Sequence, residues 1–568
     1  MCLLRVSYIK KTKLMLLPAC LLAAFVPLLS GCINNNENSH LLDSKQETIV
    51  YQDLGLSKYD PPIEVVFVRD YTSSLENLIN DMPGQLLEDN TWSRLYEEAL
   101  GIRIRYDWVA RGDLYRQKLG MAIASGEIPD VVKVNAQQLR LLTNAGLIQD
   151  MTEIYETYAT PLTKRILSEE GTGPFDSATI DGKLMALPET IASIEGAQFI
   201  WIRTDWLERV DRQPPRTMDD LLAISKAFTE EDPDQNGIDD TYGLAVSQHL
   251  WDPVMGIMDF LAGYGAYAKI WLKGDDGKLV YGGIQPEVKL ALKALQEMYK
   301  NGQLDPEFGL KDGNKVKAMI ASGKIGMFYG EQWGSFVAQA SRKEFPESQW
   351  QAFPIVSDHG EKPKVPLRFS TYQYLAVRKD YPYPEAIVKM FNLHLEKNWG
   401  KTAEYETYYS NPLPVWQLSP VTPFPVKKNL EAYRQMEKAR RTGDTSQLGA
   451  EAKAIQRNID SYLSGSADSD AGWGWERTYG RNGAFAIMDE YEKKGQLLYE
   501  SFVGAPTDTM INMQAILDEL ELETYINIIL GRPIEDFDRF VAEWKELGGD
   551  QITEEVNRWF AGKSVHQP

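Results

Sequence analysis

The chain is almost free of cysteine. Among its 568 residues only Cys2, Cys20 and Cys32 carry a thiol, and all three lie near the N-terminus. Residues 33–568 therefore exclude a disulfide framework, a thiolate zinc site and a cysteine nucleophile. A body of this length without disulfides must gain its stability from a large hydrophobic core, which over 500 residues can supply.

Histidine is also scarce, and catalytic signatures are missing. The sequence has no HExxH or other paired metal-binding spacing, no GxSxG elbow and no P-loop; its five histidines are His40, His249, His359, His394 and His566. Carboxylates number 81, so pairs occur everywhere and none stands out as a glycosidase pair. The sequence therefore predicts that the protein is not an enzyme.

Basic residues are outnumbered, which gives a formal net charge of −21. Residues 1–31 contain four cations and no acid, so the remainder carries a formal charge of −25. Such a surface repels nucleic acid and anionic head groups, which makes both poor partners. No stretch after Cys32 is long and apolar enough to span a membrane.

The N-terminus has the pattern of an export signal. Lysines between residues 10 and 13 precede an apolar run over 14–29, and the run ends on Leu-Ser-Gly-Cys32. This ending resembles the bacterial lipobox, after which the cysteine becomes a lipidated N-terminus. The apolar run of about 16 residues is shorter than the roughly 20 of a stable span. We predict a signal peptide over 1–31, lipidation of Cys32 (with palmitate or a similar acyl chain) and attachment to the outer face of the cytoplasmic membrane. A plain signal peptide or a short anchor with an incidental cysteine is the alternative.

The rest of the chain reads as one α/β fold behind a polar tether over 32–60. Helical patterns alternate with short runs rich in β-branched and aromatic residues, which predicts βαβ units and parallel sheets covered by helices. The expected strands are 63–68, 102–108, 130–134, 183–187, 199–202, 242–246, 325–328 and 374–377. The expected helices are 89–100, 114–124, 136–145, 217–228, 286–299, 315–322 and 384–395, with a largely helical region from 429 onward.

An acidic loop over 232–240 matches the start of an EF-hand calcium loop. Oxygen donors fall at relative positions 1, 3, 5 and 9, a glycine stands at 6, and the residue at 7 can offer its carbonyl. The predicted ligands of a structural Ca²⁺ are Asp232, Asp234, Asn236, Ile238 (through its carbonyl) and Asp240. Gly243 replaces the glutamate of position 12, so Asp239, Thr241 or water would complete the site. An acidic, solvated turn is the alternative.

Tryptophan and tyrosine are abundant, with 14 and 28 residues, and their rings are suitable platforms for sugar rings. Several of them follow expected strands, where open α/β sheets bind ligands. The predicted stacking residues are Trp251, Trp333, Tyr372, Trp473 and Trp475, and the predicted polar contacts are Arg368, Glu331 and Glu189. Packing in the core is the alternative role for each ring taken alone.

Several segments, taken in order, resemble the lipoprotein solute-binding proteins of bacterial ABC transporters, family 1, including their oligosaccharide- and alginate-binding members. The segments are SGEIPD at 125–130, AGLIQDMT at 145–152, DGKLMALP at 181–188, WIRTDWL at 201–207, DTYGL at 240–244, FVGAPT at 502–507 and LETYI at 522–526. The resemblance covers nearly all of the chain after Cys32.

The resemblance implies a two-lobed periplasmic-binding-protein type II fold with a hinge and a ligand cleft between the lobes. The expected lobes are 61–195 with about 366–470, and 196–365 with about 471–568. The resemblance also implies calcium on a similar loop, although Thr241 stands where the alginate-binding pattern has an acid. The implied function is a monomeric receptor that captures an oligosaccharide and delivers it to an ABC permease. An exported carbohydrate-active enzyme, a sensor partner, and a peptide or other small solute as ligand are the alternatives.

Overall fold

A computed structural model describes residues 54–190, 192–358, 360, 362–371, 373–410, 413–465 and 469–564. The signal segment, Cys32, the tether up to residue 53 and Tyr372 lie outside the described residues. No helix in these described ranges has the length and apolar character needed to cross a membrane.

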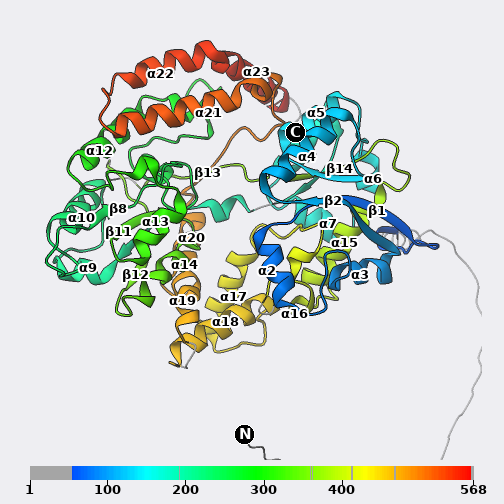
Figure 1. The fold of residues 1–568 in the computed structure, drawn as a ribbon, viewed down its shortest axis with the longest axis horizontal. Helices are drawn as coiled ribbons and strands as arrows, with labels where there is room; N and C mark the ends of the chain where they lie inside the picture. Colours follow the sequence, from blue (N-terminus) through cyan, green and yellow to red (C-terminus); the bar gives the residue numbers. More distant parts are fainter. Residues whose placement is uncertain are drawn as a thin grey trace, which may run out of the picture. The chain divides into compact units, whose positions relative to one another are not determined.

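The N-terminal strands form around a first hydrophobic core (Figure 1). Strand β1 (Ile63–Asp70) pairs in parallel with β2 (Ile102–Ala110). Strand β14 (Gln373–Val377) lies between β3 (Val131–Val134) and β6 (Leu187–Glu189) and runs antiparallel to both. The helices of this part are α2 (Ser73–Asp81), α3 (Thr91–Leu100), α4 (Gly112–Ser125), α5 (Ala136–Asn144), α6 (Thr152–Tyr158), α7 (Pro161–Leu167), α8 (Gly173–Ala178), α15 (Glu385–Trp399) and α16 (Tyr405–Tyr408).

A four-stranded sheet forms the centre of a second core. Strand β7 (Phe199–Arg203) lies between β12 (Trp350–Phe353) and β11 (Ile325–Gly330), antiparallel to both, and β8 (Tyr242–Leu244) joins β11 in parallel. Every residue of β7 and β11 is buried, as expected for strands covered on both faces. The helices of this part include α10 (Met218–Glu230), α11 (Met258–Ala262), α12 (Glu287–Lys300), α13 (Gly313–Ala321), α14 (Gly334–Gln339), α17 (Lys428–Thr442), α18 (Ala450–Leu463), α19 (Trp473–Tyr479), α20 (Ala484–Lys493), α21 (Asp508–Ile529), α22 (Asp536–Trp544) and α23 (Asp550–Ser564).

The expected strands form close to their predicted positions, but the expectation of parallel sheets is only partly right. Two strand pairs are parallel in these sheets, whereas β7 and β14 run against their neighbours. The strand expected over 183–187 divides into β5 (Lys183–Leu184) and β6. The alternation of apolar and polar residues along a strand shows which side chains are buried. It does not show whether the strand runs parallel or antiparallel to its neighbour.

The two hydrophobic cores define two lobes. The first core contains residues from Ile63 to Leu187 and from Tyr374 to Val421, and the second contains residues of the ranges 192–367 and 426–556. The chain therefore passes between the lobes three times, within 187–192, 367–374 and 421–426. The protein is an α/β molecule with two lobes joined by three crossings.

The third crossing differs from the expected division. The sequence assigned 366–470 to the first lobe, yet Leu430, Met436 and Ile455 of α17 and α18 belong to the second core. Helix α17 packs against α18 and α20, and α18 also packs against α19. The apolar face of an amphipathic helix shows that the helix is covered, but it does not show which of two cores covers it.

The second core depends on large buried rings, of which Trp201 in β7 is central. Its ring is fully buried, stacks at 6.3 Å on Phe328, and donates a hydrogen bond from Nε1 to the carbonyl of Glu331 (3.2 Å).

We expect Trp201→Ala to lower the free energy of unfolding by about 3–5 kcal/mol, because it leaves a large cavity. Leu310→Ala, at a side chain that is 72% exposed, should change it by less than about 0.5 kcal/mol. Urea unfolding of both variants measures the difference. Equal stability of the two variants would show that β7 is not central to this core.

Candidate ligand-binding cleft

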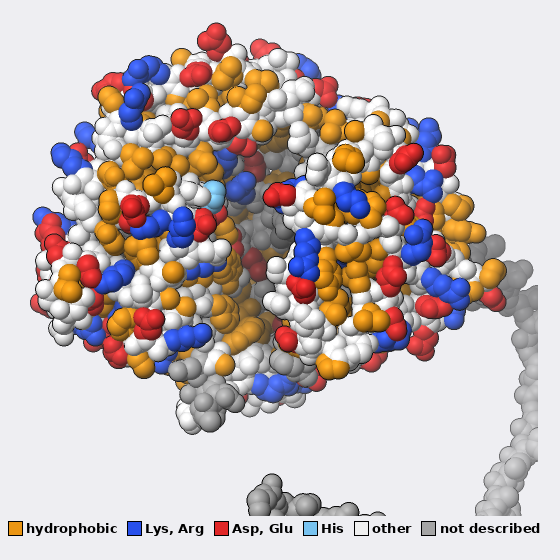
Figure 2. Space-filling model, viewed as in Figure 1, with side chains coloured by type: hydrophobic (Ala, Val, Ile, Leu, Met, Phe, Trp, Pro, Cys, Tyr) orange, Lys and Arg blue, Asp and Glu red, His pale blue; other side chains and the backbone are white. Residues whose placement is uncertain are grey.

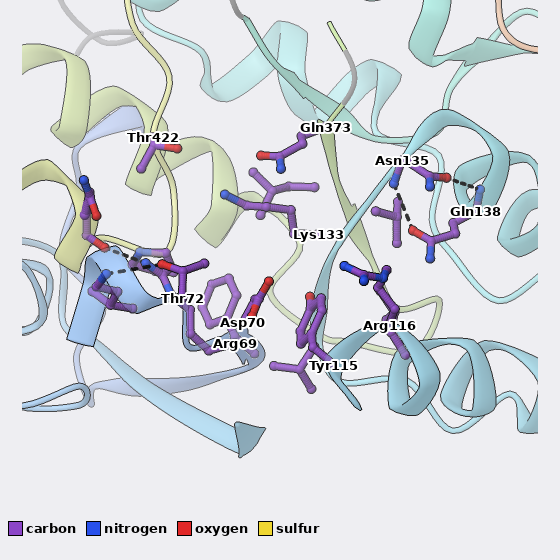
Figure 3. A pocket seen from close by; sticks show the side chains of 18 of the residues that line it. Arg69, Asp70, Thr72, Tyr115, Arg116, Lys133, Asn135, Gln138, Gln373 and Thr422 are labelled. Carbon is purple, nitrogen blue, oxygen red and sulfur yellow. Dashed lines mark hydrogen bonds between the residues drawn. The ribbon is translucent and has the colours of Figure 1, made fainter. Parts of the chain in front are cut away.

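A cavity of about 470 Å³ lies in the first lobe at the carboxyl ends of β1 and β3 (Figure 3). The chain turns there from strand to helix, so side chains beyond the strands face the cavity. Its walls combine apolar and polar groups: Phe67, Val68, Arg69, Asp70, Thr72, Leu75, Tyr115, Arg116, Leu119, Lys133, Val134, Asn135, Gln138, Gln373, Leu375, Trp416, Gln417, Pro420 and Thr422.

Helix caps fix several of these polar side chains. Asn135 accepts a hydrogen bond from the backbone N–H of Gln138 (2.8 Å), and Gln138 accepts one from the N–H of Asn135 (3.0 Å), which forms a capping box at the start of α5. Thr72 caps α2 in the same way by accepting from the N–H of Leu75 (3.2 Å). These caps hold the side chains in place before any ligand arrives.

Two cations lie in the wall of the cavity in fixed positions. The Arg69 guanidinium donates to the carbonyls of Ser419 (3.0 Å) and Gln417 (2.5 Å). The Lys133 ammonium pairs with the buried carboxylate of Glu189 at 2.7 Å. Burial lowers the pKa of Lys133, and Arg69 adds to this effect, while Glu189 opposes it. These contacts fix the positions of both cationic groups, and each group can still donate further hydrogen bonds to a ligand.

The chemistry of this wall suits a hydroxyl-rich ligand. Amides and hydroxyls supply donors and acceptors, and the rings of Tyr115 and Trp416 supply flat apolar surface. The charged residues of the lining are Arg69, Arg116, Lys133 and Asp70. Arg116 pairs with Asp113 and Lys133 pairs with Glu189, so much of the positive charge is compensated nearby. A few placed polar groups among apolar walls are typical of small-molecule sites.

A second cavity, of about 320 Å³, lies between the lobes. Gln137 of α5 lines it from the first lobe, and the second lobe contributes Lys269, Trp271, Tyr281, Phe502, Pro506, Met510, Ile511, Gln514 and Asp518, beside Arg368, Phe369 and Glu500. The side chain of Gln137 donates to the carbonyl of Ile511 (2.9 Å), and Arg140 pairs with Asp508 (3.2 Å). Figure 2 shows a hollow between the two masses of side chains, with charged groups at its edges. These contacts join α5 to α21 across the cleft.

Hydrogen bonds connect the three crossings to one another. Glu189 accepts from the backbone N–H of Thr422 (2.6 Å), and Ser193 shares a hydrogen bond with Ser370 (2.9 Å). Strand β13 (Val365–Leu367) pairs in parallel with β15 (Leu497–Tyr499). The crossings therefore form one connected base, about which the lobes can move as units.

Three predicted site residues lie in the second lobe as half-buried groups. Trp333 donates from Nε1 to the Oε2 atom of Glu331 (2.7 Å), which brings two of the predicted residues together. Trp251 packs edge-on against Tyr525, with ring centroids 5.5 Å apart. None of the three lines either cavity described above.

The other predicted residues separate into different places. Trp473 is fully buried between Arg342 and Arg477, so the structure places it in the core and not at an open surface. Trp475 stacks on Tyr479 at 5.8 Å. Arg368 is exposed and lines the interlobe cavity, and Glu189 is the buried partner of Lys133.

Sequence reasoning missed most of the first cavity. Asp70 and Asn135 directly follow the expected strands 63–68 and 130–134, so the rule applied to aromatic residues would have found them. Trp416, Gln417 and Thr422 had no such signal, because they lie at or shortly before the third crossing, which the sequence placed near residue 470.

The acidic loop adopts a tight turn with inward oxygens. Asp232 accepts from the backbone N–H groups of Asn236 and Gly237 (3.1 Å each), while the side-chain amide of Asn236 reaches Asp234 (2.8 Å) and Asp240 (3.3 Å). The Oδ1 atom of Asp234 is buried without a hydrogen-bond partner among the described residues, and burial raises the pKa of this carboxyl. The loop therefore has an unsatisfied oxygen and mutual carboxylate repulsion, which a cation would relieve.

Two further residues bear on the loop. Lys324 pairs with Asp240 and would compete with a metal ion for that carboxylate. Thr241 is buried and donates to the carbonyl of Phe228 (2.7 Å), which leaves its hydroxyl committed to α10. Across the part of the chain that the structure describes, no group of three or more His, Cys, Asp or Glu side chains is already arranged as a metal site.

Two lobes, three crossings and a cavity between the lobes define a two-lobed α/β binding protein of the periplasmic type II class. The chain belongs to a family described as bacterial extracellular solute-binding protein, which matches residues 70–398.

Individual proteins agree with this assignment. Lipoprotein LipO of Bacillus subtilis (strain 168) is 26% identical over 323 residues, which cover 55% of this chain and 61% of LipO. The structure of the S. pneumoniae ABC-transporter substrate-binding protein FusA in complex with kestose has a TM-score of 0.59 at 17% identity and covers 89% of this chain and 100% of that one. The crystal structure of alginate-binding protein AlgQ2 without calcium ion has a TM-score of 0.58 at 15% identity. It covers 88% of this chain and 98% of that one. A further FusA structure is described as an EF-hand mutant (TM-score 0.58, 17% identity, covering 89% of this chain and 100% of that one).

Glu331 is a half-buried carboxyl of the second lobe, and its pKa predicts a pH dependence. Burial raises this pKa from 4.5 to about 7, opposed by the hydrogen bond from Trp333 and helped by the carboxylate of Glu195. The folded state therefore binds the proton more tightly than the unfolded state, so stability is greatest below the unfolded pKa and falls as the pH rises towards 7.

We expect Glu331→Gln to remove this fall. Its stability relative to the parent should rise between about pH 5 and pH 8, by up to about 3 kcal/mol. The exposed Glu297→Gln should leave the pH dependence unchanged. Urea unfolding at both pH values measures this, and parallel pH profiles for the parent and Glu331→Gln would contradict it.

Proposed function

We propose that the protein is a non-catalytic receptor that captures an oligosaccharide between its lobes and presents it to an ABC permease. The observation that carries the proposal is the cavity at the ends of β1 and β3, where amides, hydroxyls and rings meet inside a two-lobed fold. Ligand contacts to both lobes would favour the closed form by shifting an existing equilibrium.

The ligand would lie on the first lobe and be covered by the second. Gln373, Asn135 and Gln138 would bond hydroxyl groups, and Tyr115 and Trp416 would stack on sugar faces. Contacts such as Gln137 with Ile511, and Arg140 with Asp508, would strengthen as the lobes close. Of the predicted residues, Arg368 at the interlobe cavity is the best placed to contact the ligand. Tyr372 remains part of the proposal, adjacent to Gln373 in the chain.

Delivery requires the receptor to stay beside its permease. We propose that Cys32 carries acyl chains that hold the protein, as a monomer, on the outer face of the cytoplasmic membrane. Two acyl chains are sufficient for stable anchoring. The family's extracellular assignment and the lipoprotein relative support this arrangement.

We also propose a structural Ca²⁺ in the loop over 232–240. Asp232, Asp234, Asn236, Asp240 and the carbonyl of Ile238 would supply its oxygen ligands. The unpartnered Oδ1 of Asp234 supports this assignment. The ion would neutralise the carboxylates and fix the connection between α10 and β8, with Lys324 displaced from Asp240.

The ligand proposal is tested by titration calorimetry with a panel of neutral and acidic oligosaccharides. For a ligand that binds, Gln373→Ala should weaken the affinity by about tenfold, because one hydrogen bond is lost. Gln456→Ala, at a half-buried position on α18 that lines neither cavity, is the matched control and should bind like the parent. Cleavage of the ligand during the titration, or affinity unaffected by Gln373→Ala, would sink this assignment.

The calcium proposal is tested by thermal unfolding with Ca²⁺ and with EDTA. At about 100 times its Kd, Ca²⁺ should stabilise the parent by about 2.7 kcal/mol. Asp234→Asn should abolish this stabilisation, while Glu208→Gln, an exposed acid outside the loop, should retain it. An identical midpoint with EDTA and with Ca²⁺ would rule out the site.

A further inference from the structure

A third cavity, of about 740 Å³, lies away from the interlobe cleft. All of its walls belong to the second lobe: β12 and the chain that follows it, the start of α10, and α20 with its two flanking turns. The lining residues are Pro215, Arg216, Gln351, Ala352, Phe353, Pro354, Ile355, Val356, Ser357, Gly360, Lys362, Pro363, Arg481, Asn482, Ala486, Ile487, Glu490, Tyr491, Lys494 and Gln496. No first-lobe residue is among them, so closure of the lobes does not form this cavity.

The floor of this outer cavity is apolar. Phe353, Ile355 and Val356 come from β12 and the residues after it, and Ala486 and Ile487 face them from α20. Ile355 and Val356 are buried, while the other three are half-buried and offer surface to an occupant. A ligand with an apolar body would gain burial here at about 25 cal/mol per Å².

Three neutral polar side chains of the outer cavity are already used by the protein. Gln351 donates to the carbonyl of Asn482, Gln496 donates to the carbonyl of Pro363 (3.3 Å), and the hydroxyl of Tyr491 accepts from the N–H of Ile355 (2.8 Å). A hydroxyl-rich sugar is therefore a poor match for the outer cavity.

The charged groups of the outer cavity are mostly basic. Its described lining has four cations and one acid, in a chain where acids outnumber bases by 81 to 60. Lys494 pairs with the acid, Glu490. Arg216 and Arg481 are exposed and form no ion pair with another described residue. Asp220, near Arg216 in the chain, instead accepts the backbone N–H of Arg216 (3.0 Å) and caps α10.

We propose that the outer cavity is a second ligand site, for a small amphiphilic organic anion. The apolar body of this ligand lies against Phe353, Ile355 and Ile487. Its carboxylate, sulfonate or phosphate is bound by Arg216 and Arg481, which come from different walls of the cavity. Guanidinium groups suit such anions because they donate two parallel hydrogen bonds.

The position of the outer cavity gives such a ligand access to the crossings. Pro363 and Gln496 line the cavity and lie two residues before β13 and one residue before β15, the paired strands at the base of the lobes. The N–H of Val365 donates to the carbonyl of Gln496 (2.9 Å). A bound anion therefore lies against this base without entering the cleft.

The test is titration calorimetry of the full chain with 4-phenylbutyrate and with its uncharged analogue 4-phenylbutanamide. We expect the anion to bind with one-to-one stoichiometry and at least about tenfold more tightly than the amide. The double variant Arg216→Gln/Arg481→Gln should weaken binding of the anion by about tenfold or more and leave that of the amide unchanged. Both positions are exposed, so folding is not at risk.

Two further variants complete the test. Ile487→Glu places a charge on the apolar floor and should abolish binding of both compounds. Arg457→Gln, at an exposed cation on α18, should change neither. The proposal is overturned by equal affinities for the anion and the amide, by an Arg216→Gln/Arg481→Gln variant that binds like the parent, or by no binding at millimolar concentration.

Discussion

The carboxylate of Glu189 is the group on which the arrangement of the cleft depends. One oxygen compensates the ammonium of Lys133 in the cavity wall, and the other accepts the N–H of Thr422 in the third crossing. A buried ion pair needs such additional hydrogen bonds to offset its desolvation. The Glu189 side chain therefore both balances the charge of Lys133 in the cavity wall and holds the third crossing in place.

The two cavities suit different ligands because different side chains line them. The first-lobe cavity offers fixed amides and rings at the ends of strands, where a hydroxyl-rich molecule can replace water. The outer cavity of the second lobe offers an apolar floor and a basic rim, and three of its neutral polar side chains are already hydrogen-bonded within the protein. One chain thus carries two cavities of different chemistry, each within one lobe, in addition to the smaller cavity between the lobes.

Much of the fold followed from local pattern. The strands at 63–70 and 325–330 and the capped helix at 218–230 were predictable, because burial period and capping residues are local properties. The site was less predictable. Trp473 was predicted to stack on a ligand, yet it lies in the core, and Trp416 reaches the cavity only because the chain crosses near residue 421. Such placements depend on contacts between distant segments, which local pattern does not contain.

The contact between Arg140 and Asp508 joins side chains that are 368 positions apart, one on each side of the cleft. The sequence beyond Cys32 has no thiol of its own. Dyes attached through cysteines introduced near these two positions would have no competing sites in that sequence. This contact across the cleft thus marks where a fluorescent reporter could convert solute capture into an optical signal.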